Sequence, residues 1–348
     1  MTNSLPVRDQ LLMSALRKRA RPNLFDTRWS GSHGIGRFST ALFSRVTGFE
    51  EVELSGHPID LMDPWRLGRY LRVLRPSLYF SPGFNVPLDS RCPFVLTVHD
   101  LNHLFVKENS SKLKRLYYSH LLRPAIQKAE FIFTPSMFSK NQIAEWSNIN
   151  ENRIVHIKPG VAQEFCSIGD RYTSDQPYFL FVGTHAPHKN LCGAIKAFSI
   201  SGLKGQFEFL ATGLPSNEIA RLIDELELDG HVRFLGRVSD SMLPKLYRGA
   251  TALVFVSLYE GFGLPIIESM SCGTPVLTSN VASMPEAAGG AAILVNPKDS
   301  EEISDAMRTI ANDDSLREQL RLKGLEWSKQ FNWDKTCTVV MDALARLM

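Results

Sequence analysis

The sequence predicts an α/β fold of two domains, each built on a parallel sheet covered by helices. Its 348 residues are enough for two hydrophobic cores of ordinary size. Short apolar runs recur along the chain and lead through glycine-containing loops into helical patterns, an order typical of strand-helix-strand units. Hydrophobic periodicity lapses between residues 162 and 176. This stretch therefore predicts the link between the two domains.

The first domain is expected to cover residues 1–168, the second residues 169–326, and a final helix over 327–348 is expected to cross back onto the first domain. Strands are predicted at 23–26, 78–80, 94–98, 131–134 and 153–157, then at 178–182, 207–210, 232–235, 252–256 and 276–278. Most of these runs have the length and the apolar character of buried parallel strands.

The stretch from Thr251 to Ser279 carries the strongest functional signal. After its apolar strand, a loop places Gly261, Gly263 and Pro265 directly ahead of a helical pattern that Gly273 closes. Such a loop presents backbone N–H groups at the positive end of a helix. Anionic or hydroxyl-rich ligands are held at sites of this kind.

Two acidic residues lie in the same stretch, Glu260 on the loop and Glu268 inside the helix. Both can face one crevice at the carboxyl end of the sheet. A pair of carboxylates that accept hydrogen bonds from hydroxyl groups suits the vicinal diols of a sugar or a ribose. Taken singly, each acid could equally be a turn acid or a solvated helix residue.

The string EGFGLPIIESMSCGTPV resembles the E-x(7)-E signature of the retaining GT-B glycosyltransferases, most closely glycosyltransferase family 4. The resemblance implies two Rossmann-like domains facing a central cleft. It also implies that Glu260 contacts the donor sugar and Glu268 the ribose of its nucleotide. The backbone amides of Phe262, Gly263 and Leu264 are implied to hold sugar hydroxyls and phosphate.

The segment HGIGRF is similar to a glycine loop of the same family that faces the donor phosphates and the acceptor. Gly34 and Gly36 are expected to allow close approach, and Arg37 is a candidate for contact with phosphate or acceptor. A surface cation at a helix start would explain Arg37 equally well. The lone GxG lacks the third glycine of a dinucleotide-binding fingerprint.

His99 follows a predicted strand directly, in TVHDLNHL. Ligands of open α/β sheets bind at this end of the strands. The segment resembles the family's strand-then-His-Asp segment, which implies that His99 contacts the transferred sugar near its reacting carbon. His99 and Glu260, together with Lys189 of the later segment GTHAPHKN, are the implied catalytic residues.

Lys189 stands at a helix entrance in GTHAPHKN, where a cation can meet a diphosphate. The string resembles the family's G-T-x-x-P-R-K-N, so Gly183 and Thr184 are expected beside the donor. His188 occupies the place where arginine is common. Either it acts as a cation or as a neutral donor, or Lys189 and the helix end suffice without it. In V-x-F-L-G-x-V, the backbone around Val238 is implied to meet the nucleotide base.

The implied reaction is transfer of a hexose, with mannose from GDP-mannose preferred, to a glycan or a lipid-linked saccharide in polysaccharide synthesis. A phosphorylase or an epimerase on the same scaffold, or a non-catalytic binder of nucleotide sugars, remains an alternative. No cofactor and no metal are expected, because no D-x-D type carboxylate pair is evident near the loops. No nucleic-acid partner is expected.

The composition indicates a cytoplasmic protein. The five cysteines are scattered, with no CxxC pair, so neither a disulfide framework nor a zinc site is suggested. No apolar run reaches the roughly 20 residues that span a bilayer, and the N-terminus does not have the order of a secretory signal.

The net charge of +3 conceals a basic first half. Leu11, Leu12, Met13 and Leu16 lie among arginines at helical spacing, and residues 107–128 combine lysines with leucines and tyrosines. Both segments suit the surface of an anionic membrane, which makes the inner face of the membrane a candidate location. A solvated helix packed on the domain edge explains the first segment equally well. For the second segment, a half-buried helix that carries solvated lysines is slightly preferred.

Overall fold

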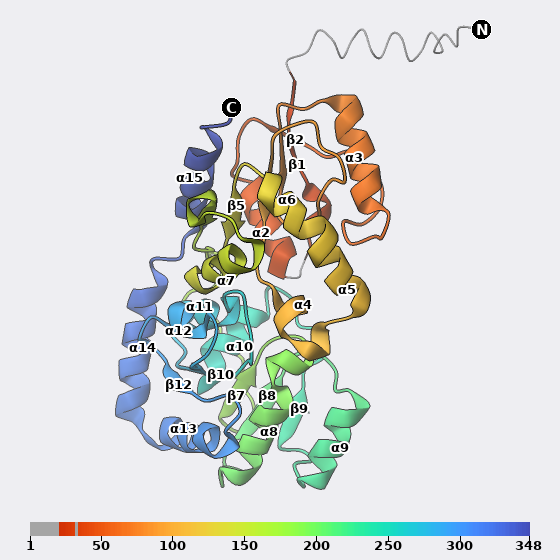
Figure 1. Ribbon diagram of the computed structural model, residues 1–348. Helices are drawn as coiled ribbons and strands as arrows, with labels where there is room; N and C mark the ends of the chain where they lie inside the picture. Colours follow the sequence, from red (N-terminus) through yellow and green to blue (C-terminus); the bar gives the residue numbers. More distant parts are fainter. Residues whose placement is uncertain (1–20, 32–33) are drawn as a thin grey trace, which may run out of the picture.

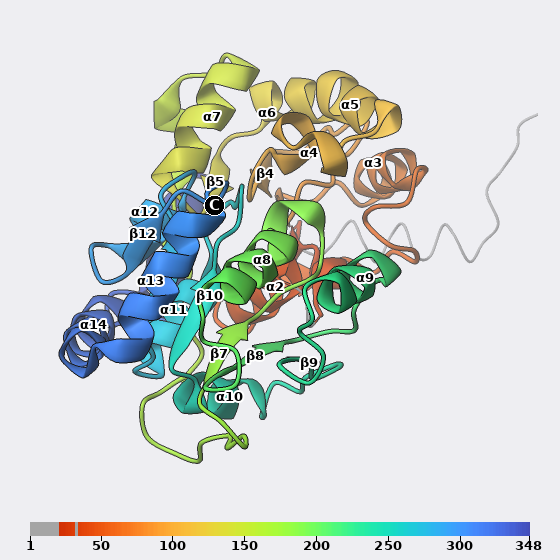
Figure 2. The same ribbon diagram turned by 90° about the horizontal axis from the view of Figure 1, so that it is seen from below.

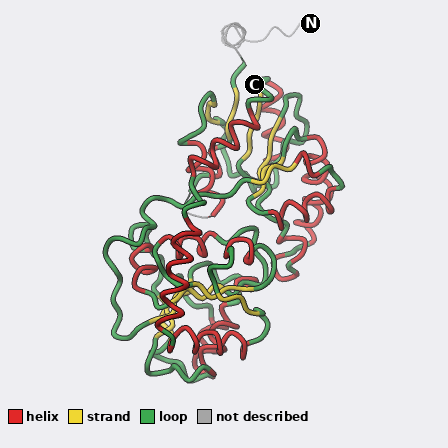
Figure 3. Tube along the Cα trace, turned by 90° about the vertical axis from the view of Figure 1, so that its left-hand side faces the viewer, coloured by secondary structure: helices red, strands yellow, loops and turns green. Residues whose placement is uncertain are grey.

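The computed structural model describes residues 21–31 and 34–348, which form two lobes, each built on a six-stranded parallel sheet (Figure 1). Figure 3 shows the two sheets as separate groups of strands with helices around them. The predicted two-domain α/β fold is thus confirmed. The predicted basic helix around Leu11 lies outside the described residues.

The first sheet has the order β2-β1-β3-β4-β5-β6. Its strands are β1 (Asn23–Phe25), β2 (Phe49–Glu51), β3 (Leu78–Ser81), β4 (Phe94–Thr97), β5 (Ile132–Thr134) and β6 (Ile154–His156). The helices of this lobe are α2 (Gly34–Phe43), α3 (Asp63–Leu74), α4 (Asn102–Phe105), α5 (Lys112–Tyr117), α6 (Arg123–Lys128) and α7 (Met137–Ser147). A 3₁₀ helix, η2 (Lys107–Asn109), and a π-helical stretch, η3 (Tyr118–Leu122), flank α5. The edge strand β2 is an element that the sequence did not predict.

The second sheet has the order β12-β11-β10-β7-β8-β9. Its strands are β7 (Tyr178–Phe181), β8 (Glu208–Ala211), β9 (Val232–Phe234), β10 (Ala252–Phe255), β11 (Val276–Ser279) and β12 (Ile293–Val295). The helices are α8 (Leu191–Ile200), α9 (Asn217–Glu225), α10 (Leu243–Gly249), α11 (Leu264–Ser271), α12 (Met284–Ala288) and α13 (Ser300–Asn312). Then follow α14 (Asp314–Ser328) and α15 (Trp333–Leu344).

Helices cover both faces of the second sheet (Figure 2). On one face, residues of α8, α9 and α13 pack with Phe179 and Phe209. On the other, residues of α10 and α11 pack with Leu253 and Phe255. All residues of β7, β8 and β10 are buried, which explains why these strands read as nearly unbroken apolar runs.

The strand order reverses between β1 and β3 in the first sheet and between β7 and β10 in the second. At such a switch point, the loops that leave neighbouring strands go to opposite faces and open a crevice at the carboxyl ends. The loops after β7 and β10 carry the glycine and acidic motifs of the second half. The fold therefore places those motifs side by side.

The C-terminal stretch is not one helix from Trp327, as the sequence had predicted. Helix α14 ends at Ser328, and Asn332 begins a new helix by accepting a hydrogen bond from the N–H of Asp334 at 2.7 Å. Side chains of α15 complete the core of the first lobe, where Val340 and Leu344 are fully buried. The limits 168/169 and 326/327 remain our proposal for the domain division.

The two places where the chain passes between the lobes lie beside each other. The N–H of Val161 donates to the carbonyl of Phe331 at 3.1 Å. Gly160 packs so closely on the second crossing that a methyl group there would lie 2.3 Å from the Trp333 nitrogen. Both connections are thus gathered at one edge of the molecule.

A carboxylate joins the lobes away from these connections. Glu286 of α12 accepts hydrogen bonds from the N–H groups of Met137 at 2.8 Å and Phe138 at 3.3 Å. These are the first residues of α7, where an acidic group is favourable because the helix N-terminus is positive. His156 Nε2 lies 3.4 Å from the same carboxylate, and burial lowers the pKa of His156. Glu286 therefore clasps the two lobes together.

We expect Glu286→Gln to weaken this clasp, because an amide loses the charge that favours the α7 N-terminus. The free energy of unfolding should fall by about 1 kcal/mol, and small-angle scattering should report a larger mean radius of gyration. Glu326→Gln, which breaks an exposed pair with Lys329, is the control and should change neither measurement. Equal scattering by both variants and the unaltered protein would contradict the clasp.

Candidate functional site

The loop after β7 brings a cation to the switch point of the second sheet. Gly183 has a φ of 150°, which carries the chain sharply out of the strand. The loop ends at Asn190, whose side-chain amide donates to the carbonyls of Val256 at 3.0 Å and Pro297 at 2.7 Å. These bonds fix the loop against the exit of β10. Thr184 stands exposed at the start of the loop.

Lys189 and Glu260 form an ion pair across the two loops. Lys189 Nζ lies 2.6 Å from Glu260 Oε1, and the side chains are only 18% and 12% exposed. Such burial makes each charge costly to leave without a partner. The structure therefore joins two of the three predicted catalytic residues directly.

His188 lies beside this pair and faces the first lobe. Asn109 Nδ2 donates to His188 Nδ1 at 2.7 Å. Burial lowers the pKa of His188, with a further lowering by Lys189 and an opposing effect of Glu260. The neutral imidazole is thus favoured at neutral pH, and Lys189 is the cation of this loop.

The second acid of the motif lies deeper, in α11. Glu268 is buried and accepts a hydrogen bond from the hydroxyl of Tyr247 at 3.0 Å. Arg37 from α2 of the other lobe reaches it at 3.3 Å and also pairs with Asp240. Burial raises the pKa of Glu268, while Arg37 opposes that shift. Arg37, Asp240, Leu264 and Glu268 line a cavity of about 360 Å³ between the lobes.

The residues between the two acids form the entrance of α11. Gly263 caps the helix with a φ of 104°, a conformation that suits glycine, and Leu264 is the first helical residue. The first N–H groups of a helix have no carbonyl partner within it. Phe262 is buried in the core of the second lobe, and Val238 packs against the same core from the loop after β9. The predicted amide donors thus lie at a helix N-terminus.

His99 approaches from the first lobe, at the carboxyl end of β4. Its Nε2 donates to the carbonyl of Pro82 at 2.9 Å, and its ring meets the ring of Phe38 edge-on. A methyl group on Gly261 would lie 2.4 Å from the His99 carbonyl oxygen. Gly261 of the EGFG loop is therefore a position where the two lobes pack too closely for a larger residue.

The two glycines of α2 differ in their surroundings. A methyl group on Gly36 would lie 2.5 Å from the carbonyl oxygen of Gly31, so this position requires glycine. On Gly34, a methyl group would meet no atom within 4 Å among the described residues. Gly36 is therefore required by packing inside the first lobe, and the expected close approach of a ligand at Gly34 and Gly36 stays a prediction.

Four of the site residues described above were not predicted: Asp100, Asn109, Asp240 and Tyr247. Asp100 lies near both Lys189 and Glu260, and burial raises the pKa of its carboxyl group to about 6. Its place directly after His99 is a signal that could have found it. Asn109 and Tyr247 carry no comparable signal, because their partners are distant in the sequence.

Most of the predicted side chains thus form two groups, and each group contains residues of both lobes. His99, His188, Lys189 and Glu260 gather around the loops after β4, β7 and β10, and Arg37, Leu264 and Glu268 gather around the cavity. Within residues 21–31 and 34–348, no cluster of three His, Cys, Asp or Glu side chains is arranged to hold a metal ion. In that same part of the chain, no helix is both long and apolar enough to cross a membrane.

The chain matches two family models. Residues 11–165 match the model described as Glycosyltransferase Family 4, and residues 170–327 match the model described as Glycosyl transferases group 1. O-antigen chain mannosyltransferase B of Escherichia coli is 33% identical over 297 residues, which cover 81% of this chain and 78% of that protein.

Solved structures share the fold at low sequence identity. Sucrose-phosphate synthase from Thermosynechococcus elongatus aligns with a TM-score of 0.76 at 17% identity, over 94% of this chain and 99% of that one. HepE of Anabaena, solved in complex with UDP and glucose, aligns with a TM-score of 0.74 at 17% identity, over 94% and 100%. With two parallel sheets facing a cleft and the E-x(7)-E loop at its wall, this chain belongs to the GT-B glycosyltransferases of family 4.

Proposed function

We propose that this glycosyltransferase moves a hexose from a nucleotide sugar, with retention of configuration, to a glycan or a lipid-linked saccharide in surface polysaccharide synthesis. The observation that carries the proposal is the Lys189–Glu260 pair at the switch point, with His99 on the opposite lobe. Mannose from GDP-mannose is our preferred donor, supported by the similarity to O-antigen chain mannosyltransferase B.

The donor would lie with its nucleotide along the second lobe. Glu268 would accept hydrogen bonds from the ribose hydroxyls, since its buried carboxylate faces the cavity between the lobes. The backbone around Val238 would meet the base. Arg37, which already spans the cleft to Glu268, would then stand beside the diphosphate.

In the donor complex, Lys189 would pair with the diphosphate in place of Glu260. Both contacts are charge-assisted, so the cation exchanges one anionic partner for another. Glu260 is then released to accept hydrogen bonds from the sugar hydroxyls, with His99 on the other side. The amides of Phe262, Gly263 and Leu264 stabilise the negative charge that develops as the diphosphate departs.

Retention follows if the acceptor attacks from the face that the diphosphate leaves. The bond from the anomeric carbon to the diphosphate oxygen breaks, and a bond to the acceptor oxygen forms. A diphosphate oxygen takes the proton of the acceptor hydroxyl. The protein contributes orientation and fixed charges to this step.

We also propose that the enzyme works at the cytoplasmic face of the membrane.

We propose further that the reaction needs no metal ion. Lys189, Arg37 and the helix N-terminus provide the positive charge that a cation would otherwise supply. EDTA should leave the rate unchanged, measured as nucleotide diphosphate released. Loss of activity that magnesium or manganese restores would contradict this proposal.

A binder of nucleotide sugars without activity would need Glu268 but neither Lys189 nor His99. A phosphorylase would release free sugar phosphate, and an epimerase would release an altered nucleotide sugar. Incubation with labelled GDP-mannose, UDP-glucose and dTDP-glucose, followed by product analysis, separates these alternatives. Nuclear magnetic resonance of the new linkage should report the same anomeric configuration as in the donor, whereas an inverted linkage would exclude the proposed mechanism.

We expect Lys189→Gln and Glu260→Gln each to lower the rate of transfer by 100-fold or more, on the order of the loss when a fixed transition-state donor is removed. Each change also leaves a largely buried charge unpaired, which should lower the free energy of unfolding by about 1–3 kcal/mol.

The double variant is the control for the pair. Because it removes both charges, it should recover part of the stability that each single variant loses, and chemical denaturation measures this coupling. Strictly additive losses would show that the two side chains do not interact in solution.

A further inference from the structure

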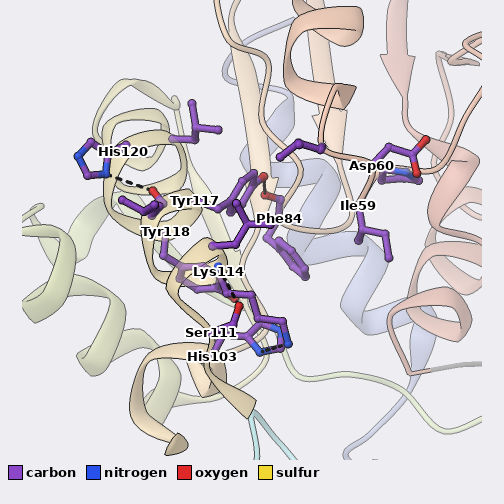
Figure 4. A pocket seen from close by; sticks show the side chains of 14 residues that line it. Ile59, Asp60, Phe84, His103, Ser111, Lys114, Tyr117, Tyr118 and His120 are labelled. Atoms are coloured by element: carbon purple, nitrogen blue, oxygen red, sulfur yellow. Dashed lines mark hydrogen bonds between the residues drawn. The ribbon is translucent and has the colours of Figure 1, made fainter. Parts of the chain in front are cut away.

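An apolar groove lies in the first lobe, between the segment before α3 and the helical stretch α5–η3 (Figure 4). Its volume is about 630 Å³, within the range of small-molecule sites. Most of its walls are aliphatic or aromatic: Pro58, Ile59, Leu61, Phe84, Leu113, Leu116, Tyr117 and Leu121. The catalytic roles proposed above use none of these side chains.

The rim of the groove exposes an unusual amount of aliphatic surface. Ile59 is 65% exposed, Leu61 75%, Leu113 60% and Leu116 54%. They come from two segments that face each other across the groove, whereas isolated exposed apolar residues need no explanation. A ligand that covered both rims would remove this surface from water.

One end of the groove adjoins the catalytic cleft. His103 and Lys114 lie together at that end in Figure 4, and Lys114 Nζ donates to the carbonyl of Asn109 at 3.0 Å. The side chain of Asn109 in turn bonds to His188. Phe84 in the wall is two residues from Pro82, the carbonyl partner of His99. A molecule in the groove would therefore have its polar end beside the predicted reaction centre.

The charges at this end favour an anion. Lys114 is the lysine that lines the groove there, whereas Lys112 and Arg115 of the same helix are exposed outside the lining. The acidic residue in the lining is Asp60, whose carboxylate is paired with Arg66 at 2.7 Å. The groove thus combines an apolar channel with a basic end.

We propose that this groove binds the aliphatic chain of a lipid-linked acceptor, with the acceptor's anionic phosphate group at Lys114 and its saccharide directed into the cleft. This inference rests on the proposed function, since it identifies the class of acceptor. The apolar length of the groove selects a chain, and its basic end selects a phosphate over a neutral head.

The test is binding of single-chain phosphates, kept below the concentration at which they form micelles. Decyl phosphate should bind at least tenfold more tightly than hexyl phosphate, because each buried methylene adds up to about fourfold in affinity. Decyl maltoside, with its neutral head, should bind several-fold more weakly than decyl phosphate. Titration calorimetry measures all three.

Matched variants locate the site. Leu113→Gln with Leu116→Gln should weaken binding of decyl phosphate by tenfold or more, and Lys114→Gln should weaken it several-fold. Leu322→Gln is the control, because Leu322 also lies on a helix and is 54% exposed, as Leu116 is, but stands far from the groove. It should bind decyl phosphate as the unaltered protein does.

Equal binding by all variants, or no dependence on chain length, would overturn the proposal. Binding only to vesicles of phosphatidylglycerol and phosphatidylcholine, without binding of the monomeric phosphate, would assign the surface to a membrane and also overturn it. A thermal-shift measurement with nucleotide sugars on the same samples keeps the two proposals separate. If no nucleotide sugar raises the melting temperature, the proposed function is contradicted. The calorimetric result tests only the groove.

Discussion

The ion pair between Lys189 and Glu260 is the interaction on which the site depends. It joins the loops after β7 and β10, which meet because the strand order reverses between these strands. Each charge is largely withdrawn from water, so each needs either the other or a replacement. In the proposed reaction, a diphosphate and a set of sugar hydroxyls would be such replacements. The pair therefore orients both side chains, and the proposed donor would separate them by bonding to both at once.

The first lobe completes this arrangement from across the cleft. Arg37 reaches Glu268, the loop at His99 packs on Gly261, and the α7 N-terminus holds Glu286. Each contact joins a polar or charged group of one lobe to a group of the other. Neither lobe by itself carries both the carboxylate pair and the opposing histidine, so the motifs are spread over more than half of the chain.

The central strands could be predicted because burial on both faces demands unbroken apolar runs, as in β7 and β10. The edge strands β2 and β12 could not, since each has three residues and β2 ends in two exposed acids. The E-x(7)-E loop was recognisable because its glycines and prolines have a local backbone role.

Contacts between residues far apart in the chain could not be predicted from the sequence. Lys189 and Glu260 are 71 residues apart, and Arg37 and Glu268 are 231 apart, so no local pattern pairs them. Glu286 accepts hydrogen bonds from backbone N–H groups, which every residue except proline has. The sequence therefore could not indicate which residues Glu286 contacts. The break at residues 329–332 was missed because the apolar pattern of the last helix resumes soon after it.

The adjacent crossings at Val161 and Phe331 limit how the molecule can open. Because both covalent connections lie at one edge, a rotation about that edge would separate the lobes without breaking either connection. Groups far from that edge travel furthest for a given angle. A chemical crosslink between two engineered cysteines, one on each lobe and far from Val161 and Phe331, would prevent the lobes from separating. The same crosslink beside Val161 and Phe331 would still allow this rotation.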